Sequence, residues 1–196
     1  MILYLDTETT GLYPGNICQL SYIMQDKKDI FAKNLFFAVD NVDYGAYCVH
    51  GLSVSKLKIL SDRKRFSDKI AEIKTDFNKA DVVVSHNTAF DFMFLRAEFD
   101  RSGEIFSTNK DFCSMKNNVS VCKLPKTRGR GYKYPKLNEL CNRFAITEHD
   151  VIEKTKQLFG EDIKGFHDAR VDTSAVFLTV NEEIRHGYNI ELEDFL

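Results

Sequence analysis

Apolar residues in the first forty positions form three short runs that predict β-strands. The first run covers Ile2 to Asp6, and the turn-forming stretch TTGLYPG follows it. The second run covers 17–25 and the third covers 30–39. Because only short polar connections separate the runs, they predict an antiparallel meander.

A helical period replaces this pattern later in the chain. Apolar residues recur at i, i+4, i+7 and i+11, which predicts one face of an amphipathic helix formed by Phe66, Ile70, Ile73 and Phe77. The remaining pattern predicts a strand at 81–86, a helix at 88–102, a short strand at 104–108 or 110–115, and helices at 135–144 and 167–184. The helix at 135–144 would have Pro135 at its start.

Three strands followed by alternating helices and strands predict a mixed sheet with helices on both faces. The sequence shows no internal repeat and no low-complexity linker, so we expect a single domain over 1–196. An α/β architecture of this kind is compatible with many activities. Function must therefore be argued from particular side chains.

The composition is that of an ordinary globular protein, with 43% hydrophobic and 29% charged residues. No stretch is long and apolar enough for a membrane span, and no signal peptide is visible, so we expect a cytoplasmic protein. None of the five cysteines forms a CxxC pair. We expect reduced thiols, partly in the core, and no disulfide or zinc site at Cys18, Cys48, Cys113, Cys122 or Cys141.

The net charge of -2 conceals one strongly basic segment. The stretch KLPKTRGRGYKYPK holds two tyrosines, no acid and six basic residues, namely Lys123, Lys126, Arg128, Arg130, Lys133 and Lys136. Most charge runs are simply solvated loops, and in isolation this one favours that interpretation. Basic residues interleaved with aromatic ones also suit a phosphate backbone with stackable bases.

Two acids stand at the end of the first predicted strand. Residues i and i+2 of a strand point to the same face, so Asp6 and Glu8 should project together if the strand extends that far. Their charges would repel, and burial would make both ionised forms costlier unless a cation lies between them. A central strand rarely carries two acids for stability alone.

Two further segments add polar groups at the edges of predicted elements. SHNTAFD places Asp91 just inside a helix, and HDARVD places His167 near a helix start with Asp172 five residues later. Taken singly, Asp91 or Asp168 would simply complement a helix dipole. Together the acids predict a metal site, because Mg²⁺ prefers oxygen ligands and two ions can activate a water and stabilise a leaving oxygen. A neutral histidine could then accept the proton of that water.

These segments resemble the three motifs of the DEDDh 3′–5′ exonucleases, a DnaQ-like superfamily that includes the proofreading subunit of bacterial DNA polymerase III and RNase T. DTETTGL resembles the first motif, HNTAFDFMFL the second, and HDARVD the third, which has the form HxAxxD. Their order and spacing agree, so the resemblance covers residues 2 to about 180. VHGLS and YPKLNELC also resemble segments of the family.

The resemblance implies a ribonuclease-H-like fold with a five-stranded mixed sheet flanked by helices. It implies two Mg²⁺ or Mn²⁺ ions, with Asp6, Glu8 and Asp172 on the catalytic ion. Asp6 would bridge to a second ion that Asp91 holds directly or through water, and His167 would be the general base. Substrate contacts would come from Thr9, Thr10, Gly11, Leu12, His86, Asn87 and Phe90, with Leu12 wedged against the terminal base. Independently of the resemblance, the basic segment predicts further contacts to substrate phosphates from Arg128, Arg130 and Lys133.

The expected function is therefore metal-dependent removal of nucleoside monophosphates from 3′ ends, principally of single-stranded DNA. An RNA-trimming exoribonuclease of the same family stays open, because no motif reports on the sugar 2′ position. A catalytically inactive nucleic-acid-binding module or a polymerase accessory subunit also stays open. The complete set of acids and the histidine argues against the former. The 24 residues after Asp172 argue against a polymerase-binding tail.

Overall fold

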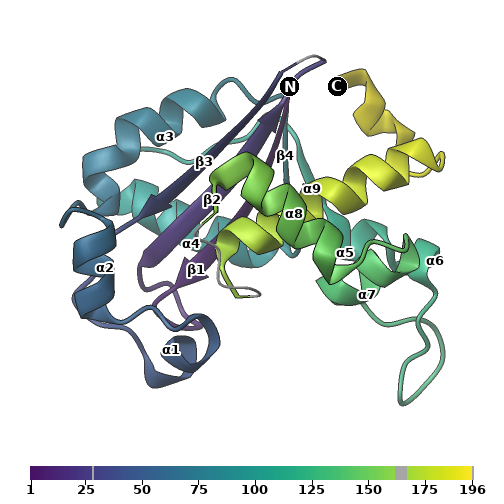
Figure 1. The fold of residues 1–196 in the computed structure, drawn as a ribbon, viewed down its shortest axis with the longest axis horizontal. Coiled ribbons are helices and arrows are strands. Elements are labelled where there is room, and N and C mark those ends of the chain that lie inside the picture. Colours follow the sequence, from purple (N-terminus) through teal and green to yellow (C-terminus); the bar gives the residue numbers. More distant parts are fainter. Residues whose placement is uncertain (28, 162–166, 196) are drawn as a thin grey trace.

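The chain folds around one five-stranded sheet with strand order β3-β2-β1-β4-β5 (Figure 1). The computed structural model describes residues 1–27, 29–161 and 167–195. The strands are β1 (Ile2–Thr9), β2 (Ile17–Gln25), β3 (Ile30–Phe36), β4 (Val82–Ser85) and β5 (Asp111–Cys113). β1 to β3 form the expected antiparallel meander, while β4 runs parallel to β1 and β5 runs parallel to β4. The mixed sheet is thus confirmed.

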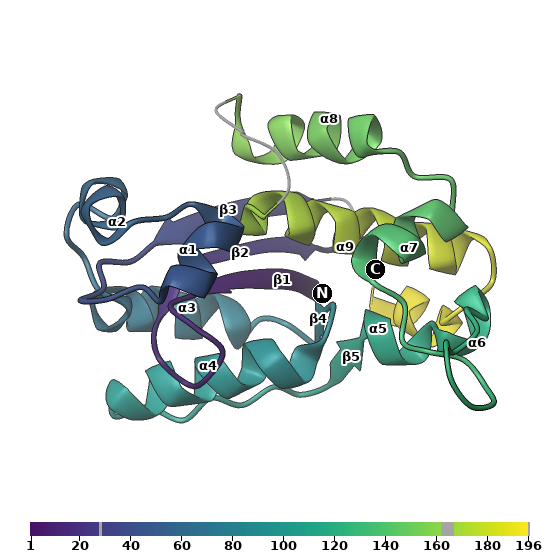
Figure 2. The ribbon, with the colours of Figure 1, turned by 90° about the horizontal axis from the view of Figure 1, so that it is seen from below.

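Helices cover both faces of this sheet (Figure 2). One face carries α3 (Ile70–Phe77) and α4 (Thr88–Arg101), and the other carries α7 (Leu137–Arg143), α8 (Glu148–Phe159) and α9 (Ala169–Arg185). The remaining short helices are α1 (Tyr44–His50), α2 (Val54–Leu60), η1 (Phe66–Lys69), α5 (Ser114–Asn117), α6 (Val119–Cys122) and η2 (Ile190–Phe195). Within the described ranges, no helix is both long and apolar enough to span a membrane.

The alternation of side chains along β1 decides where its acids point. Leu3 and Leu5 belong to the core that packs on α3 and α4. Ile2 and Tyr4 belong to the core that packs on α9, and the ring of Tyr4 meets that of Phe177 edge to face. Because side chains on a strand alternate between faces, the even-numbered residues further along β1 also face α9. β1 extends to Thr9, so Asp6 and Glu8 both lie on it, as the i, i+2 argument required.

Several predicted boundaries were wrong for local reasons. The third strand ends at Phe36 and not at residue 39, because the amide of Ala38 donates to the Lys64 carbonyl and leads the chain out of the sheet. The segment at 135–144 becomes helical only at Leu137, since Lys136 is still extended. The first turn of the helix at 66–77 is a 3-10 turn. Of the two positions predicted for the last strand, the structure selects 110–115, where β5 covers 111–113.

The described structure contains all five cysteines as free thiols. Cys18, Cys113 and Cys141 are buried, which agrees with the expectation that some lie in the core.

Glu183 on α9 is a fully buried acid away from the predicted site. Its carboxylate accepts hydrogen bonds from the amides of Asn118 and Asn189 at 2.8 and 2.7 Å. Burial nevertheless raises the pKa of Glu183 from its ordinary 4.5 to about 7. The folded state therefore binds this proton more tightly than the unfolded state. The resulting stabilisation is full below pH 4.5 and is lost as the pH rises through 7.

Replacing Glu183 with glutamine should flatten this part of the pH dependence of stability. We expect the free energy of unfolding of the wild type, relative to Glu183→Gln, to fall by on the order of 3 kcal/mol between pH 4.5 and 8. Urea unfolding of both proteins without metal at several pH values would measure the difference. Glu182→Gln, a partly exposed neighbour, is the control. Parallel stability curves for wild type and Glu183→Gln would contradict the shifted pKa.

Candidate active site

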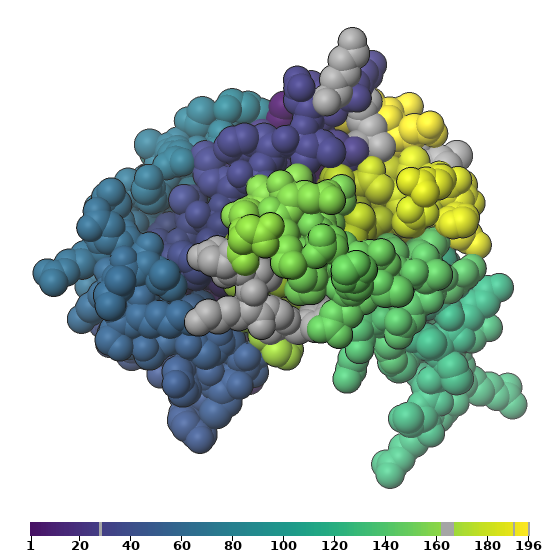
Figure 3. Space-filling model, viewed as in Figure 1, coloured from purple at the N-terminus to yellow at the C-terminus, as the bar shows by residue number. Residues whose placement is uncertain are grey.

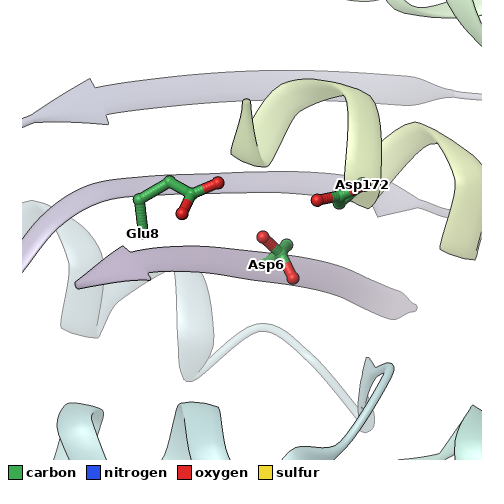
Figure 4. A group of neighbouring side chains, drawn as sticks. All are labelled: Asp6, Glu8 and Asp172. Carbon is green, nitrogen blue, oxygen red and sulfur yellow. The ribbon is translucent and has the colours of Figure 1, made fainter. Parts of the chain in front are cut away.

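Three carboxylates meet between β1 and the first turn of α9. One oxygen from each of Asp6, Glu8 and Asp172 lies within 4.8 Å of the other two (Figure 4). β1 aims the first two at α9, and Asp168, the N-cap of α9, places Asp172 in the first helical turn. These three residues are called the carboxylate cluster below. Sequence reasoning predicted all three members.

The carboxylates of the cluster repel one another. Burial raises the pKa of Asp6 well above its usual range, and the charges of Asp172, Asp91 and Glu8 raise it further. Burial, together with the charges of Asp172, Asp168 and Asp91, raises the pKa of Glu8 to about 9, and burial raises that of Asp172 to about 6. A divalent cation among these oxygens would reverse the repulsion. The donor set, three hard oxygen ligands, fits Mg²⁺ or Mn²⁺.

Asp91 stands beside the cluster, outside the group of mutually close oxygens. It lies in the first turn of α4, and its Oδ1 accepts a hydrogen bond of 2.8 Å from the hydroxyl of Thr7. Burial raises the pKa of Asp91 to about 6, although the Thr7 hydroxyl opposes the shift. Because the charge of Asp91 also raises the pKa of Asp6, the two carboxylates share one electrostatic field.

His167 is exposed just before α9 and lies in the left-handed region, with φ of 67°. Together with Asp6 and Asp172 it lines a cavity of about 540 Å³, the polar cavity below, with Lys136 and Asn138 on its wall. The charge of His167 also opposes the upward shift of the Asp172 pKa. The structure thus brings the predicted base to the same cavity as two of the acids.

His86 lines the polar cavity too, but both of its ring nitrogens are engaged. Nδ1 pairs with the hydroxyl of Ser114 at 2.9 Å, and Nε2 lies 3.1 Å from the carbonyl oxygen of Pro135. Since a carbonyl only accepts, Nε2 carries the proton and Nδ1 accepts from Ser114. Burial lowers the pKa of His86 to about 4, so the ring stays neutral. It joins the end of β4 to the segment before α7.

A second cavity of about 640 Å³, the apolar cavity below, opens on the other side of the cluster. Glu8 contributes to its wall, and the predicted substrate residues that line it are Thr9, Gly11, Leu12 and Phe90. Leu12 is 79% exposed, so its side chain is free to contact a ligand. A Cβ at Gly11 would lie 2.2 Å from Oδ2 of Asp43, so any larger residue there would require the Asp43 side chain to move.

Thr10 and Asn87, also predicted to contact substrate, line neither cavity. Thr10 is buried, and its hydroxyl accepts the amide of Asn16 at 3.0 Å. Asn87 adopts φ of 98° as the N-cap of α4, with no hydrogen bond from its side chain to the helix.

His50 also lines the apolar cavity, and sequence reasoning did not select it. Its Nδ1 accepts a hydrogen bond of 3.0 Å from the amide of Leu52. The ring proton therefore lies on Nε2, which donates to the carbonyl oxygen of Thr9 at 3.2 Å. Burial lowers the pKa of His50, which favours this neutral form. The residue lies within the VHGLS segment that carried part of the resemblance, so the signal was present.

A second unpredicted feature is a polar bridge behind the cluster. Asp168 forms an ion pair of 2.7 Å with Arg170 and accepts a 2.8 Å hydrogen bond from Gln19 on β2. Burial raises the pKa of Asp168, but these bonds outweigh it and hold the pKa below the ordinary value. Because Gln19 pairs with Glu8 across the sheet, the bridge ties the start of α9 to the strand beside the acids.

The basic segment forms a hairpin between α6 and α7. Pro125 bridges to Tyr132, and the amide of Lys133 donates to the Leu124 carbonyl at 2.9 Å. Arg128 and Arg130 are exposed at its tip. The ammonium of Lys133 instead contacts both oxygens of Glu139 at 2.6 Å. Residues 123–136 are called the basic hairpin below.

Comparison with known proteins identifies the family. The sequence model of the RNase_T exonuclease family matches residues 3–176. DNA polymerase III subunit epsilon of Escherichia coli is 27% identical over 156 residues, which are 74% of this chain and 60% of that protein. The same subunit from Buchnera aphidicola is 26% identical over 156 residues, which are 74% of this chain and 62% of that protein. The chain thus spans about six tenths of the length of these relatives.

Solved structures agree on the fold. Exonuclease I of E. coli in complex with a dA16 oligonucleotide superimposes with a TM-score of 0.70 at 15% identity, over 99% of this chain and 42% of that one. The zinc-bound form of the same enzyme with single-stranded DNA gives a TM-score of 0.68 at 16% identity, with 99% and 42% coverage. At such identities the likeness establishes the ribonuclease-H-like fold alone. The fold expected from the sequence is confirmed.

Proposed function

Because the chain belongs to the RNase_T exonuclease family, we propose that it is a metal-dependent 3′–5′ exonuclease that removes nucleoside monophosphates from single-stranded DNA. The observation that carries the proposal is the carboxylate cluster, whose three oxygens lie within 4.8 Å of one another beside an exposed histidine. Acids in such proximity, one buried and two half-buried, are unfavourable without a cation. A metal site at the end of the central strand explains why they are there.

The chemistry follows from the side chains around the cluster. Asp6, Glu8 and Asp172 would hold one divalent ion, and Asp91 would contribute to a second that Asp6 shares. Bound Mg²⁺ or Mn²⁺ would supply an activated water and stabilise the departing oxygen. His167 would accept one proton of the attacking water, whose oxygen bonds to phosphorus. The bond between phosphorus and the 3′ oxygen of the preceding nucleotide would break, that oxygen would take up a proton from solvent, and a nucleoside 5′-monophosphate would be released.

The apolar cavity suits the terminal nucleotide. Leu12 and Phe90 offer apolar surface to a base, and Thr9 and Gly11 offer backbone groups beside Glu8. DNA is favoured over RNA because the exonuclease I structures with the same fold contain single-stranded DNA. A polymerase partner is a further possibility that the epsilon-subunit relatives raise, and none of the described surfaces argues for it specifically.

A comparison of matched substrates tests the proposal. Single-stranded DNA, duplex DNA and RNA of one sequence, each labelled at the 3′ end, would be incubated with Mg²⁺. We expect labelled mononucleotide to appear first, and fastest from single-stranded DNA. Faster release from RNA would favour the exoribonuclease alternative. Binding without hydrolysis of any substrate would favour the inactive module.

Metal dependence gives a second test with a readout that does not require turnover. We expect hydrolysis to stop in excess EDTA and to return with Mg²⁺ or Mn²⁺. Ions that bind only the folded state should also raise the melting temperature, since saturation about 100-fold above Kd stabilises by about 2.7 kcal/mol. Differential scanning fluorimetry with and without millimolar Mg²⁺ would measure the shift, and Asp6→Asn should reduce it. Undiminished hydrolysis in EDTA would refute the mechanism.

A further inference from the structure

Resting on the proposed function, we propose that the basic hairpin is an arm for the substrate strand upstream of the scissile bond. The 3′-terminal nucleotide enters the apolar cavity, and the strand crosses the carboxylate cluster and the polar cavity. It then leaves along the hairpin toward Arg128 and Arg130. The hairpin consequently strengthens binding only of strands long enough to reach its tip.

The two cavities give the site a direction. The apolar cavity shares Glu8 with the carboxylate cluster, and the polar cavity shares Asp6 and Asp172 with it. A strand whose phosphate lies over the cluster must therefore extend into both. One end meets Leu12 and Phe90, which suit an unstacked terminal base, and the other meets polar groups that suit a continuing backbone.

Lys136 connects the polar cavity to the hairpin. It lines the polar cavity and is also the last residue of the hairpin, directly before α7. Figures 1 and 2 show α1 near the C-terminal end of β1 and the hairpin on the opposite side of the molecule, next to α6 and α7, and Figure 3 shows the hairpin standing off the body at the lower right. The hairpin thus begins at the reaction centre and projects away from it.

The base of the arm is fixed while its tip is left open. Lys133 is paired with Glu139, whose carboxylate also accepts the amide of Lys136 at 2.8 Å. The Pro135 carbonyl accepts from His86, so the end of β4 and the hairpin base are held together. At the tip, Gly129 and Gly131 adopt positive φ, which permits a tight turn that presents Arg128 and Arg130 to solvent.

The charges and rings of the arm match a single strand of nucleic acid. Among the described residues, none of Lys123, Lys126, Arg128, Arg130 and Lys136 has an ion-pair partner. Tyr132 and Tyr134 are exposed by 47% and 57%, and residues i and i+2 of an extended segment share a face, so both rings can stack on bases. An acidic protein segment would match the charges, but it would not explain the continuity with the polar cavity.

The length of the arm sets how many nucleotides a strand needs to reach the tip of the hairpin. Six residue steps separate Lys136 from Arg130, which span up to about 20 Å at about 3.3 Å per residue. At about 3.4 Å per nucleotide of a stacked strand, this corresponds to about six nucleotides. A trinucleotide should therefore occupy the cavities without reaching the tip, whereas a strand of about twelve nucleotides should reach it.

A charge-removal variant tests the arm by binding. Arg128→Ser combined with Arg130→Ser would be compared with wild type for affinity to labelled oligothymidylates of about 3 and about 12 nucleotides, in Ca²⁺ to suppress turnover. For the longer strand, loss of two phosphate contacts should reduce the slope of log binding constant against log salt concentration by about 1.4 in magnitude. The affinity for that strand at about 0.1 M salt should fall on the order of tenfold. Affinity for the trinucleotide should change by less than about twofold.

The control removes the same charge elsewhere. Arg63→Ser combined with Arg96→Ser takes two exposed arginines, one from the turn after α2 and one from α4, on the side away from the hairpin (Figure 1). It should leave both affinities and the salt slope as they are. Equal losses for both strand lengths, or an unchanged slope for the longer strand, would overturn the arm. An unchanged slope would leave the hairpin as a surface for an acidic protein partner.

Failure of the arm is separable from failure of the proposed function. The p-nitrophenyl ester of thymidine 5′-monophosphate occupies the reaction centre alone, and its hydrolysis by the wild-type protein with Mg²⁺ tests the active site. If the wild type does not cleave it or any DNA, the proposed function fails. If the wild type cleaves it while the arginine variant binds long strands normally, only the arm fails.

Discussion

Asp172→Ala should lose both metal binding and turnover while the protein stays folded. Asp172 supplies one of three mutually close oxygens, so its loss leaves an incomplete ligand set at the end of β1. We expect turnover to fall by more than about 100-fold, the upper range for losing a group that merely orients a metal ligand. Calorimetric titration with Mn²⁺ and release of mononucleotide from single-stranded DNA would measure the two losses.

Stability without metal separates this loss from misfolding. The charge of Asp172 raises the pKa of both Asp6 and Glu8, so its removal relieves repulsion within the carboxylate cluster. The metal-free variant should melt at or above the wild-type temperature, yet its melting temperature should not rise with Mg²⁺. Asp100→Ala, which removes an exposed carboxylate from α4, is the control and should keep the Mg²⁺ response. An Asp172→Ala protein with the full Mg²⁺ response would contradict its assignment as a ligand.

The sheet was predictable because its central strands are defined by short-range patterns. The apolar runs that became β1 and β2 are buried along almost their whole length. The period of Phe66, Ile73 and Phe77 likewise predicted the helical segment that packs on one face. The sequence of α1 shows no helical spacing of apolar residues, because none of its residues is buried in the core. α8 likewise has only two buried residues, Val151 and Thr155.

Residue spacing along the chain predicted only part of the site. The i, i+2 spacing of Asp6 and Glu8 predicted their common face, but their approach to Asp172 depends on how α9 packs on β1. That proximity came from the family resemblance and not from spacing. The bridge of Gln19, Asp168 and Arg170 joins β2 to α9 and had no motif to reveal it. Such contacts between distant segments require the packed structure.

His167→Ala should slow the reaction without removing metal or substrate. The imidazole lines the polar cavity with Asp6 and Asp172, but it is not one of the three close oxygen donors. Mn²⁺ affinity and binding of an oligothymidylate should therefore stay near wild type. Turnover should fall by about 10²–10⁴-fold, the usual effect of losing a positioned base.

The pH dependence of turnover distinguishes a base from a structural residue. Protonation of a histidine base inactivates it, so the wild-type rate should decline at acidic pH and the variant should lack that limb. Added imidazole should restore part of the rate to His167→Ala and none to Asp172→Ala. His149→Ala, which removes an exposed histidine from α8, is the matched control. Near wild-type turnover with the same acidic limb in His167→Ala would rule out this role. His86 would then be the histidine to test, although its engaged ring nitrogens and its pKa of about 4 argue against it.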